Sequence, residues 1–150
     1  AQLDRFLTSI SLGYPDVDAE LHLLGAYGEA AKRDPVAILD KDSVAALRDA
    51  CEEVHLHPDL ARYIVTLARA TREDQSIKLG ISPRGSMHLA TACKGYALVK
   101  GRQQVIAEDI QKLIPPVWNH RILPRHGRDN DSTQAHDLMQ RIVTNVAVLR

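Results

Sequence analysis

The sequence predicts an all-α helical bundle preceded by a short strand. Three observations support this prediction. Most apolar residues recur at the spacing of amphipathic helices. Apolar and polar residues alternate as in a strand only over residues 7–12, and 45% of the residues are hydrophobic. With 150 residues that include only one Trp and one Phe, we expect one compact core packed by aliphatic side chains and alanines.

The first elements follow from local patterns. Residues 7–12, "LTSISL", alternate apolar and polar side chains and predict a strand. "GYPD" then turns the chain, and Asp16 is a plausible N-cap for a helix through Leu21, Leu24 and Tyr27. A second helix is expected from Ser43. Its apolar face comprises Val44, Leu47, Cys51 and Val54.

The best-patterned helix opens at Pro58, after "HLH". Its apolar residues follow the i, i+3, i+4, i+7 rule. They are Leu60, Tyr63, Ile64 and Leu67. Residues 74–82 are expected to form a loop, and Ser82 and Pro83 then give the N-cap and first position of another helix. Gly101 is suited to follow the end of that helix.

The remaining chain predicts two more helices. An extended "QQV" leads into a helix that Pro115 and Pro116 should end or kink, because proline removes a donor and clashes with the preceding turn. An extended "RILP" follows, and the polar residues 125–135 are expected to form a mobile loop. The last amphipathic helix contains Leu138, Met139, Ile142, Val143 and Val146.

The placement of Arg84 is unusual. It falls in the first turn of its helix, where the helix dipole disfavours a cation by roughly 0.3–1 kcal/mol. A helix N-terminus with an arginine beside it suits a phosphate group. The alternative is an arginine that extends from the surface into solvent.

Charge and composition restrict the function classes. Lys+Arg and Asp+Glu both number 19, which argues against broad electrostatic affinity for nucleic acid or an anionic membrane. Cys51 and Cys93 lie outside any CxxC pattern and are expected to be free thiols, as in the cytoplasm. No apolar run approaches membrane-spanning length. His55 and His57 suggest loop polarity rather than a metal site, and no metal is expected.

One basic cluster is ambiguous. It could contact phosphate, but such a run more often forms a solvated loop. The cluster comprises Arg121, Arg125, His126 and Arg128. No phosphate loop of the form GxxxxGK(S/T) occurs in the chain.

In combination, the motifs are specific. "LDRFLTSISLGYPD", "DLARYIVTLARATRE" and "LGISPRGSMHLATACKGYALVKGRQQVIAEDIQKLIPPVWNHRI" resemble, in order and spacing, the MoxR family of AAA+ ATPases. The resemblance covers residues 1–123 and, more loosely, the final helix. It implies that residues 1–13 are the end of the ATPase core and residues 14–150 the helical lid.

The resemblance also implies roles for individual residues. Arg5 matches the arginine finger, which acts in trans on the γ-phosphate bound by an adjacent subunit. Arg84 matches the sensor-2 arginine, and Ser82 and Pro83 share its nucleotide-binding position. ATP and Mg²⁺ would be bound mainly by Walker motifs upstream of Ala1, so this chain should be inactive alone.

The intact protein is expected to be a cytoplasmic homo-oligomer, a hexameric ring, that remodels or matures a client complex, with a von Willebrand A-type protein as a possible client. This chain departs from the family at Ile81 and Gly85, which replace alanines, and at Ile106-Ala107, which replaces Thr-Pro. The extra glycine should soften the helix start, and the loss of threonine removes an N-cap.

Two alternatives remain open from the sequence. One is a stand-alone helical interaction module that uses the amphipathic helix from Pro58 to Arg72 and never meets nucleotide. The other is a helix-turn-helix DNA reader, which would need a basic recognition face that the balanced charge does not favour.

Overall fold

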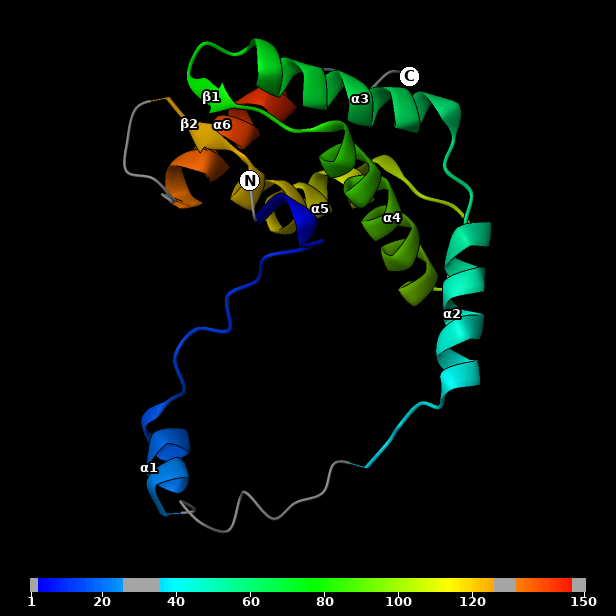
Figure 1. Cartoon of the computed structure of the whole chain (residues 1–150), viewed down its shortest axis with the longest axis vertical. Coiled ribbons are helices and arrows are strands. Elements are labelled where there is room, and N and C mark those ends of the chain that lie inside the picture. Colours follow the sequence, from blue (N-terminus) through cyan, green and yellow to red (C-terminus); the bar gives the residue numbers. More distant parts are fainter. Residues whose placement is uncertain (1–2, 26–35, 126–131, 147–150) are drawn as a thin grey trace.

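The computed structural model describes residues 3–25, 36–125 and 132–146, which form a helical body with an extended N-terminal arm (Figure 1). This confirms the predicted all-α class. In chain order the elements are η1 (Leu3–Arg5), α1 (Val17–Gly25), α2 (Lys41–Glu53), α3 (Pro58–Glu73), β1 (Ile77–Leu79), α4 (Pro83–Val99), α5 (Ala107–Trp118), η3 (Asn119–Arg121), β2 (Leu123–Pro124) and α6 (Ser132–Asn145).

Side-chain caps fix the starts of the helices. Asp16 Oδ1 accepts a hydrogen bond from Ala19 N at 2.8 Å, as expected for the N-cap of α1. The second helix begins at Lys41, two positions before the predicted Ser43, because Asp40 Oδ1 caps it through Ser43 N at 2.7 Å. Tyr27, predicted to extend α1, lies outside the described residues.

The core lies where α3, α4, α5 and α6 meet. Its members are aliphatic apart from a few larger side chains, and Leu67, Leu89, Ile110 and Trp118 are each 0% exposed. The buried face of α3 consists of Tyr63, Ile64, Leu67, Ala68 and Thr71. The apolar face that an interaction module would have to offer to a partner is therefore covered by the chain's own core.

The predicted strand over residues 7–12 is not formed. The segment has no regular structure, and among the described residues its one backbone-to-backbone hydrogen bond to the body runs from Ser9 N to the carbonyl of Pro116 at 2.8 Å. A strand needs a neighbour to pair with along its length, and the part of the chain that the structure describes offers none to this segment. The described residues instead pair β1 with β2, antiparallel, with Ile77 opposite Pro124 and Leu79 opposite Leu123. Part of the predicted loop 74–82 is therefore a strand.

Two other boundaries differ from prediction. Of the two outcomes expected of the tandem prolines, an end or a kink, the first does not occur, because α5 continues through Pro115 and Pro116 to Trp118 and then into η3. The last helix begins at Ser132, inside the predicted polar loop, because the buried Ala135 anchors its first turn. His126 and Arg128 of that loop lie outside the described residues.

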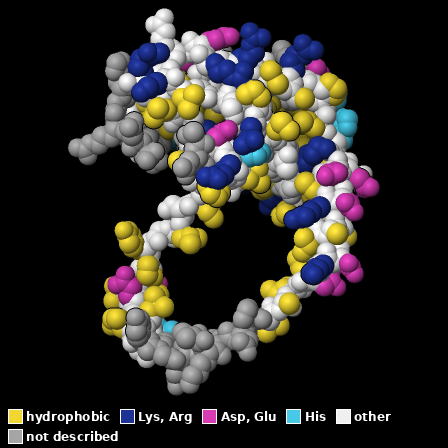
Figure 2. Space-filling view, viewed as in Figure 1, with side chains coloured by type: hydrophobic (Ala, Val, Ile, Leu, Met, Phe, Trp, Pro, Cys, Tyr) yellow, Lys and Arg dark blue, Asp and Glu magenta, His cyan; other side chains and the backbone are white. Residues whose placement is uncertain are grey.

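The N-terminal arm carries apolar side chains that the body does not cover. Figure 2 shows them along the arm and along the segment that leads to α2. The most exposed are Leu12 at 93%, Tyr14 at 97% and Ile38 at 93%. In the part of the chain that the structure describes, no helix has the length and apolar character needed to cross a bilayer.

Candidate functional site

The first turn of α4 carries the arginine that the sequence singles out. Ser82 is the N-cap, and its Oγ accepts from Gly85 N at 3.1 Å while its carbonyl accepts from Ser86 N at 3.1 Å. Pro83 has no N–H. The side chain of Arg84 is exposed, and within the described ranges the structure gives it no hydrogen bond or ion pair.

The segment that leads into α4 is fixed to the end of α3. Ile81 N donates to Thr71 Oγ1 at 2.9 Å, and Arg72 Nε donates to the carbonyl of Ile81 at 2.6 Å. Gly80 is necessary at this approach, because a Cβ there would lie 2.7 Å from the carbonyl oxygen of Thr71. The position of the Arg84 backbone is therefore set by the body of the bundle.

Asp4 joins the N-terminal segment to this same helix end. Ser82 Oγ donates to Asp4 Oδ1 and Oδ2, both at 3.1 Å, across 78 positions of sequence. Arg121 Nε also donates to Asp4 Oδ1, at 3.2 Å. The first turn of α4 contains no acidic residue of its own, so the carboxylate beside its positive end comes from Asp4.

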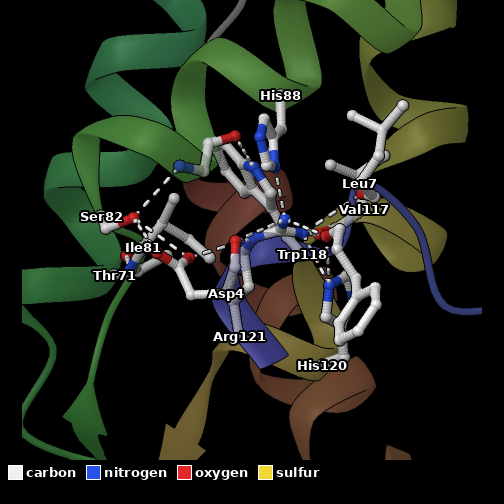
Figure 3. Close-up of polar contacts among 12 residues, drawn as sticks. Asp4, Leu7, Thr71, Ile81, Ser82, His88, Val117, Trp118, His120 and Arg121 are labelled. Carbon is white, nitrogen blue, oxygen red and sulfur yellow. Dashed lines mark hydrogen bonds and ion pairs between the residues drawn. The ribbon is translucent and has the colours of Figure 1, made fainter. Parts of the chain in front are cut away.

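Arg121 is the centre of a buried polar cluster (Figure 3). Its side chain is 1% exposed, which corrects the expectation of a solvated basic loop. The guanidinium is buried because backbone carbonyls and ring nitrogens surround it, and a desolvated cation requires such partners. Its remaining partners are the carbonyls of Asp4, Phe6, Leu7 and Val117, His88 Nδ1 at 2.6 Å and His120 Nε2 at 2.7 Å. Arg125, by contrast, is exposed.

The two histidines beside Arg121 are held in their neutral form. Burial lowers the pKa of His88, and the positive charges of Arg121 and Arg84 lower it further, while Asp4 opposes the shift. Burial and the Arg121 charge likewise lower the pKa of His120. A ring nitrogen that accepts a hydrogen bond from a guanidinium must be unprotonated, so the tautomers we assign leave both rings uncharged.

Gly85 and Ile81, two of the departures from the family pattern, are complementary in size. A Cβ on Gly85 would lie 2.8 Å from Ile81 Cγ2 and 3.2 Å from Arg121 Cδ. The larger Ile81 thus fills the space that an alanine methyl at position 85 would need. The carbonyl of Gly85 accepts a hydrogen bond from Trp118 Nε1 at 2.9 Å, which anchors this turn despite the glycine.

Arg5 lies in η1, directly after Asp4. Its side chain is exposed, with the guanidinium carbon 5.8 Å from the centre of the Phe6 ring. Arg84 is two positions from Ser82, the partner of Asp4. The structure therefore brings the segments of the two predicted arginines together at one contact, which the sequence alone did not reveal.

The "GR…ED" motif has a structural role in the helical bundle. Gly101 adopts a φ of 70° after α4, a conformation suited to glycine. Arg102 donates two bonds to the buried Asp109, at 2.7 and 2.8 Å. Asp109 also accepts from Ile106 N at 3.0 Å, while Asp109 N, the donor that a threonine side chain at position 106 would cap, donates to the carbonyl of Ile106 at 3.1 Å. Burial would raise the pKa of Asp109, but the Arg102 and Ile106 hydrogen bonds outweigh it and lower that pKa.

The thiols and the "HLH" motif take no part in this site. Cys51 and Cys93 are free, as predicted, and burial raises the pKa of Cys93 to about 12. His55 forms a parallel bridge with Gln104, and His57 Nδ1 accepts from Asp59 N at 3.2 Å. The described residues contain no group of three or more His, Cys, Asp or Glu side chains placed to hold a metal ion.

Comparison with known proteins agrees with the motifs. Residues 69–142 match the AAA lid domain family. The chain is 34% identical to an uncharacterized protein, YeaC, of Bacillus subtilis, covering 99% of this chain and 47% of that protein. It is 29% identical to the chaperone MoxR1 of Mycobacterium tuberculosis, covering 99% and 41%, and 35% identical to the protein MoxR of Paracoccus denitrificans, covering 45% and 24%.

The fold has a counterpart in a crystal structure. A candidate ATPase from Cytophaga hutchinsonii superposes with a TM-score of 0.80 at 24% identity, covering 99% of this chain and 48% of that one. The chain spans about half the length of the curated relatives that it matches over its whole extent.

Proposed function

Because this chain belongs to the MoxR family of AAA+ ATPases and carries its lid domain, we propose that it positions two arginines for ATP hydrolysis in a larger protein. The observation that carries the proposal is the junction at Asp4. It brings the segment of Arg5 to the N-terminus of α4, where the side chain of Arg84 is exposed.

The two arginines have complementary tasks in this proposal. ATP with Mg²⁺, held mainly by an upstream core with Walker motifs, supplies the phosphoryl group that is transferred to water. Arg5 acts as the arginine finger toward the nucleotide of an adjacent subunit, and Arg84 acts as sensor 2. A planar guanidinium contacts two phosphate oxygens at once and neutralises charge that develops on them. Because the Arg5 and Arg84 segments meet, we propose that both serve the same neighbouring nucleotide.

The roles of the other predicted site residues are more limited. Ser82 Oγ is already engaged, capping Gly85 N and donating to Asp4. Pro83 offers no N–H. Ser82 and Pro83 thus set the direction of the helix start, and in our proposal the contact with phosphate falls to the guanidinium and backbone N–H of Arg84.

The domain division follows from the same picture. We propose that residues 1–13 complete the ATPase core and that residues 14–150 form the lid. The uncovered apolar side chains of Ile10 and Leu12 support the assignment of their segment to the core, because an exposed apolar run favours burial against another surface.

At the level of the whole protein, we propose a cytoplasmic homo-oligomeric ring, hexameric as the family resemblance implies. Hydrolysis would move the lids and drive remodelling or maturation of a client complex. A von Willebrand A-type protein is the client we would examine first. We propose no nucleic-acid or membrane partner.

The experiment measures steady-state ATP turnover of the full-length protein carrying Arg5→Ala or Arg84→Ala. Arginine fingers contribute about 10³–10⁵ in rate in other nucleotidases, so turnover should fall strongly in both variants. The far-UV circular dichroism of each full-length variant verifies that the helical fold is unchanged. Near-normal turnover in both variants would reject the assigned roles.

A further inference from the structure

We propose that Asp4 is a positioning residue for Arg5, which it holds by tying η1 to the N-terminus of α4 and to Arg121. The inference rests on the function proposed above. It assigns no contact with nucleotide to Asp4 itself. We infer that the lid orients Arg5 of its own subunit through the carboxylate of Asp4.

The first step of the reasoning is that η1 cannot hold its own position. It is a single three-residue turn with no buried residue, and the chain after it has no strand partner. Such a turn gains little from its own backbone bonds. Its orientation must therefore come from contacts with the body.

The second step identifies those contacts. Asp4 Oδ1 receives hydrogen bonds from two separate elements, Ser82 Oγ at 3.1 Å and Arg121 Nε at 3.2 Å. Arg121 also donates to the carbonyl of Asp4 at 3.1 Å, and to that of Phe6. The residues on both sides of Arg5 are thus fixed by Arg121, which Figure 3 shows beside Asp4, while the side chain of Arg5 is exposed.

The third step concerns the strength of this contact. The Asp4 side chain is 33% exposed and that of Arg121 is 1% exposed, so the ion pair is largely shielded from water. Charge-assisted hydrogen bonds in such surroundings are the stronger kind. Ser82 Oγ simultaneously accepts from Gly85 N, so the link continues into the first turn of α4, where Arg84 lies. Displacement of the lid helix would therefore also displace the finger.

The experiment is a double-mutant cycle between Asp4 and Arg5 in the full-length protein, read as ATP turnover. Asp4→Ala should lower kcat by about 10–100-fold, as small misplacements of catalytic groups do. The affinity for a non-hydrolysable ATP analogue should stay within about threefold, since the finger approaches the neighbouring site. Asp49→Ala is the matched control: it removes an exposed carboxylate on α2 and should leave kcat within about twofold.

The cycle distinguishes positioning from an independent effect. In an Arg5→Ala background, Asp4→Ala should cost no more than about another twofold, because the group it positions is already gone. Asp4→Asn retains an oxygen acceptor for Ser82 and should recover part of the lost turnover. If Asp4→Ala impairs folding, as far-UV circular dichroism of the full-length protein would report, the Asp4→Asn variant provides the test instead.

Two results would overturn the inference. One is turnover of Asp4→Ala equal to that of Asp49→Ala, and the other is the same fold loss from Asp4→Ala with and without Arg5. Either result leaves the proposed function intact if Arg5→Ala itself is slow. If Arg5→Ala turns over at the wild-type rate, the proposed function is wrong and the inference falls with it.

Discussion

Gly85→Ala tests whether the start of α4 is packed as tightly as the structure indicates. The added methyl would lie 2.8 Å from Ile81 Cγ2 and 3.2 Å from Arg121 Cδ, whereas carbon atoms normally approach to about 3.5–4.0 Å. Ile81 is 0% exposed, so it has no open space to move into. The substitution therefore overpacks the junction between α4 and Arg121.

Two opposing effects determine how much Gly85→Ala changes the free energy of unfolding. Overpacking a core costs about 1–3 kcal/mol. Replacing glycine by alanine inside a helix returns up to about 1 kcal/mol. The free energy of unfolding should thus fall by about 1–2 kcal/mol in Gly85→Ala, which corresponds to roughly 2–8 °C in Tm for a domain of this size.

The companion substitution makes the prediction specific. Ile81→Ala alone leaves a cavity and should cost about 2–5 kcal/mol. In the double variant the new methyl at position 85 enters the space that the isoleucine vacates. The double variant should therefore be more stable than the sum of the single effects by about 1 kcal/mol or more.

The assay is urea unfolding of the 150-residue chain, with Gly95→Ala as a matched control in the same helix. A Cβ at Gly95 would meet only Cys51 Sγ, at 3.8 Å, an ordinary contact. This control should be unchanged or stabilised by about 0.4–1 kcal/mol. Equal responses of Gly85→Ala and Gly95→Ala, or additive effects of the two substitutions at 81 and 85, would refute the reasoning.

Two further predictions concern buried charge. Arg102→Ala should lower the free energy of unfolding by about 3–5 kcal/mol, because it leaves the buried Asp109 carboxylate without its partner. The folded pKa of Asp109 lies below its usual 3.8, so the pair's contribution is present above that value and is lost as the pH falls through the folded pKa. An unchanged urea midpoint in the variant at neutral pH would contradict this. The lowered pKa values of His88 and His120 predict full stability above about pH 6.5 and a loss of stability as acid protonates the rings beside the positive charge of Arg121. Asp4 opposes this effect at both rings, and the carbonyl of Phe6 opposes it at His120, but neither outweighs it. His88→Asn should weaken the pH dependence of the urea midpoint between about pH 7.5 and 5.5. If the urea midpoints of the variant and the wild type depend on pH in the same way, His88 does not cause the loss of stability in acid.

The helices could be predicted because their signals are local. Proline at the first position of α3 and α4, the Asp16 and Ser82 caps, and the spacing of Leu60, Tyr63 and Leu67 each act within a few residues. Gly101 was predicted from the same local chemistry and adopts the expected positive φ. The motifs then identified the family, whose lid domain the comparisons match.

The features that the sequence could not predict depend on contacts between residues that lie far apart in the chain. The segment 7–12 alternates like a strand, but alternation specifies a face and supplies no neighbouring strand. Arg121 was grouped with a polar loop because burial of a cation depends on carbonyls and rings that only folding brings together. The Asp4–Ser82 contact spans 78 positions, and no periodicity encodes it. The "HR" at the end of the family motif was the available sign that Arg121 is structural.

The central claim is that Arg5 acts on a nucleotide bound by a neighbouring subunit. The most direct measurement mixes the full-length Arg5→Ala protein with one whose P-loop lysine is replaced, and follows ATP turnover across the mixing ratio. Each protein alone should be nearly inactive. Mixed rings should recover activity, because an intact finger then faces a competent nucleotide site. Absence of recovery in rings shown to contain both proteins would contradict the account.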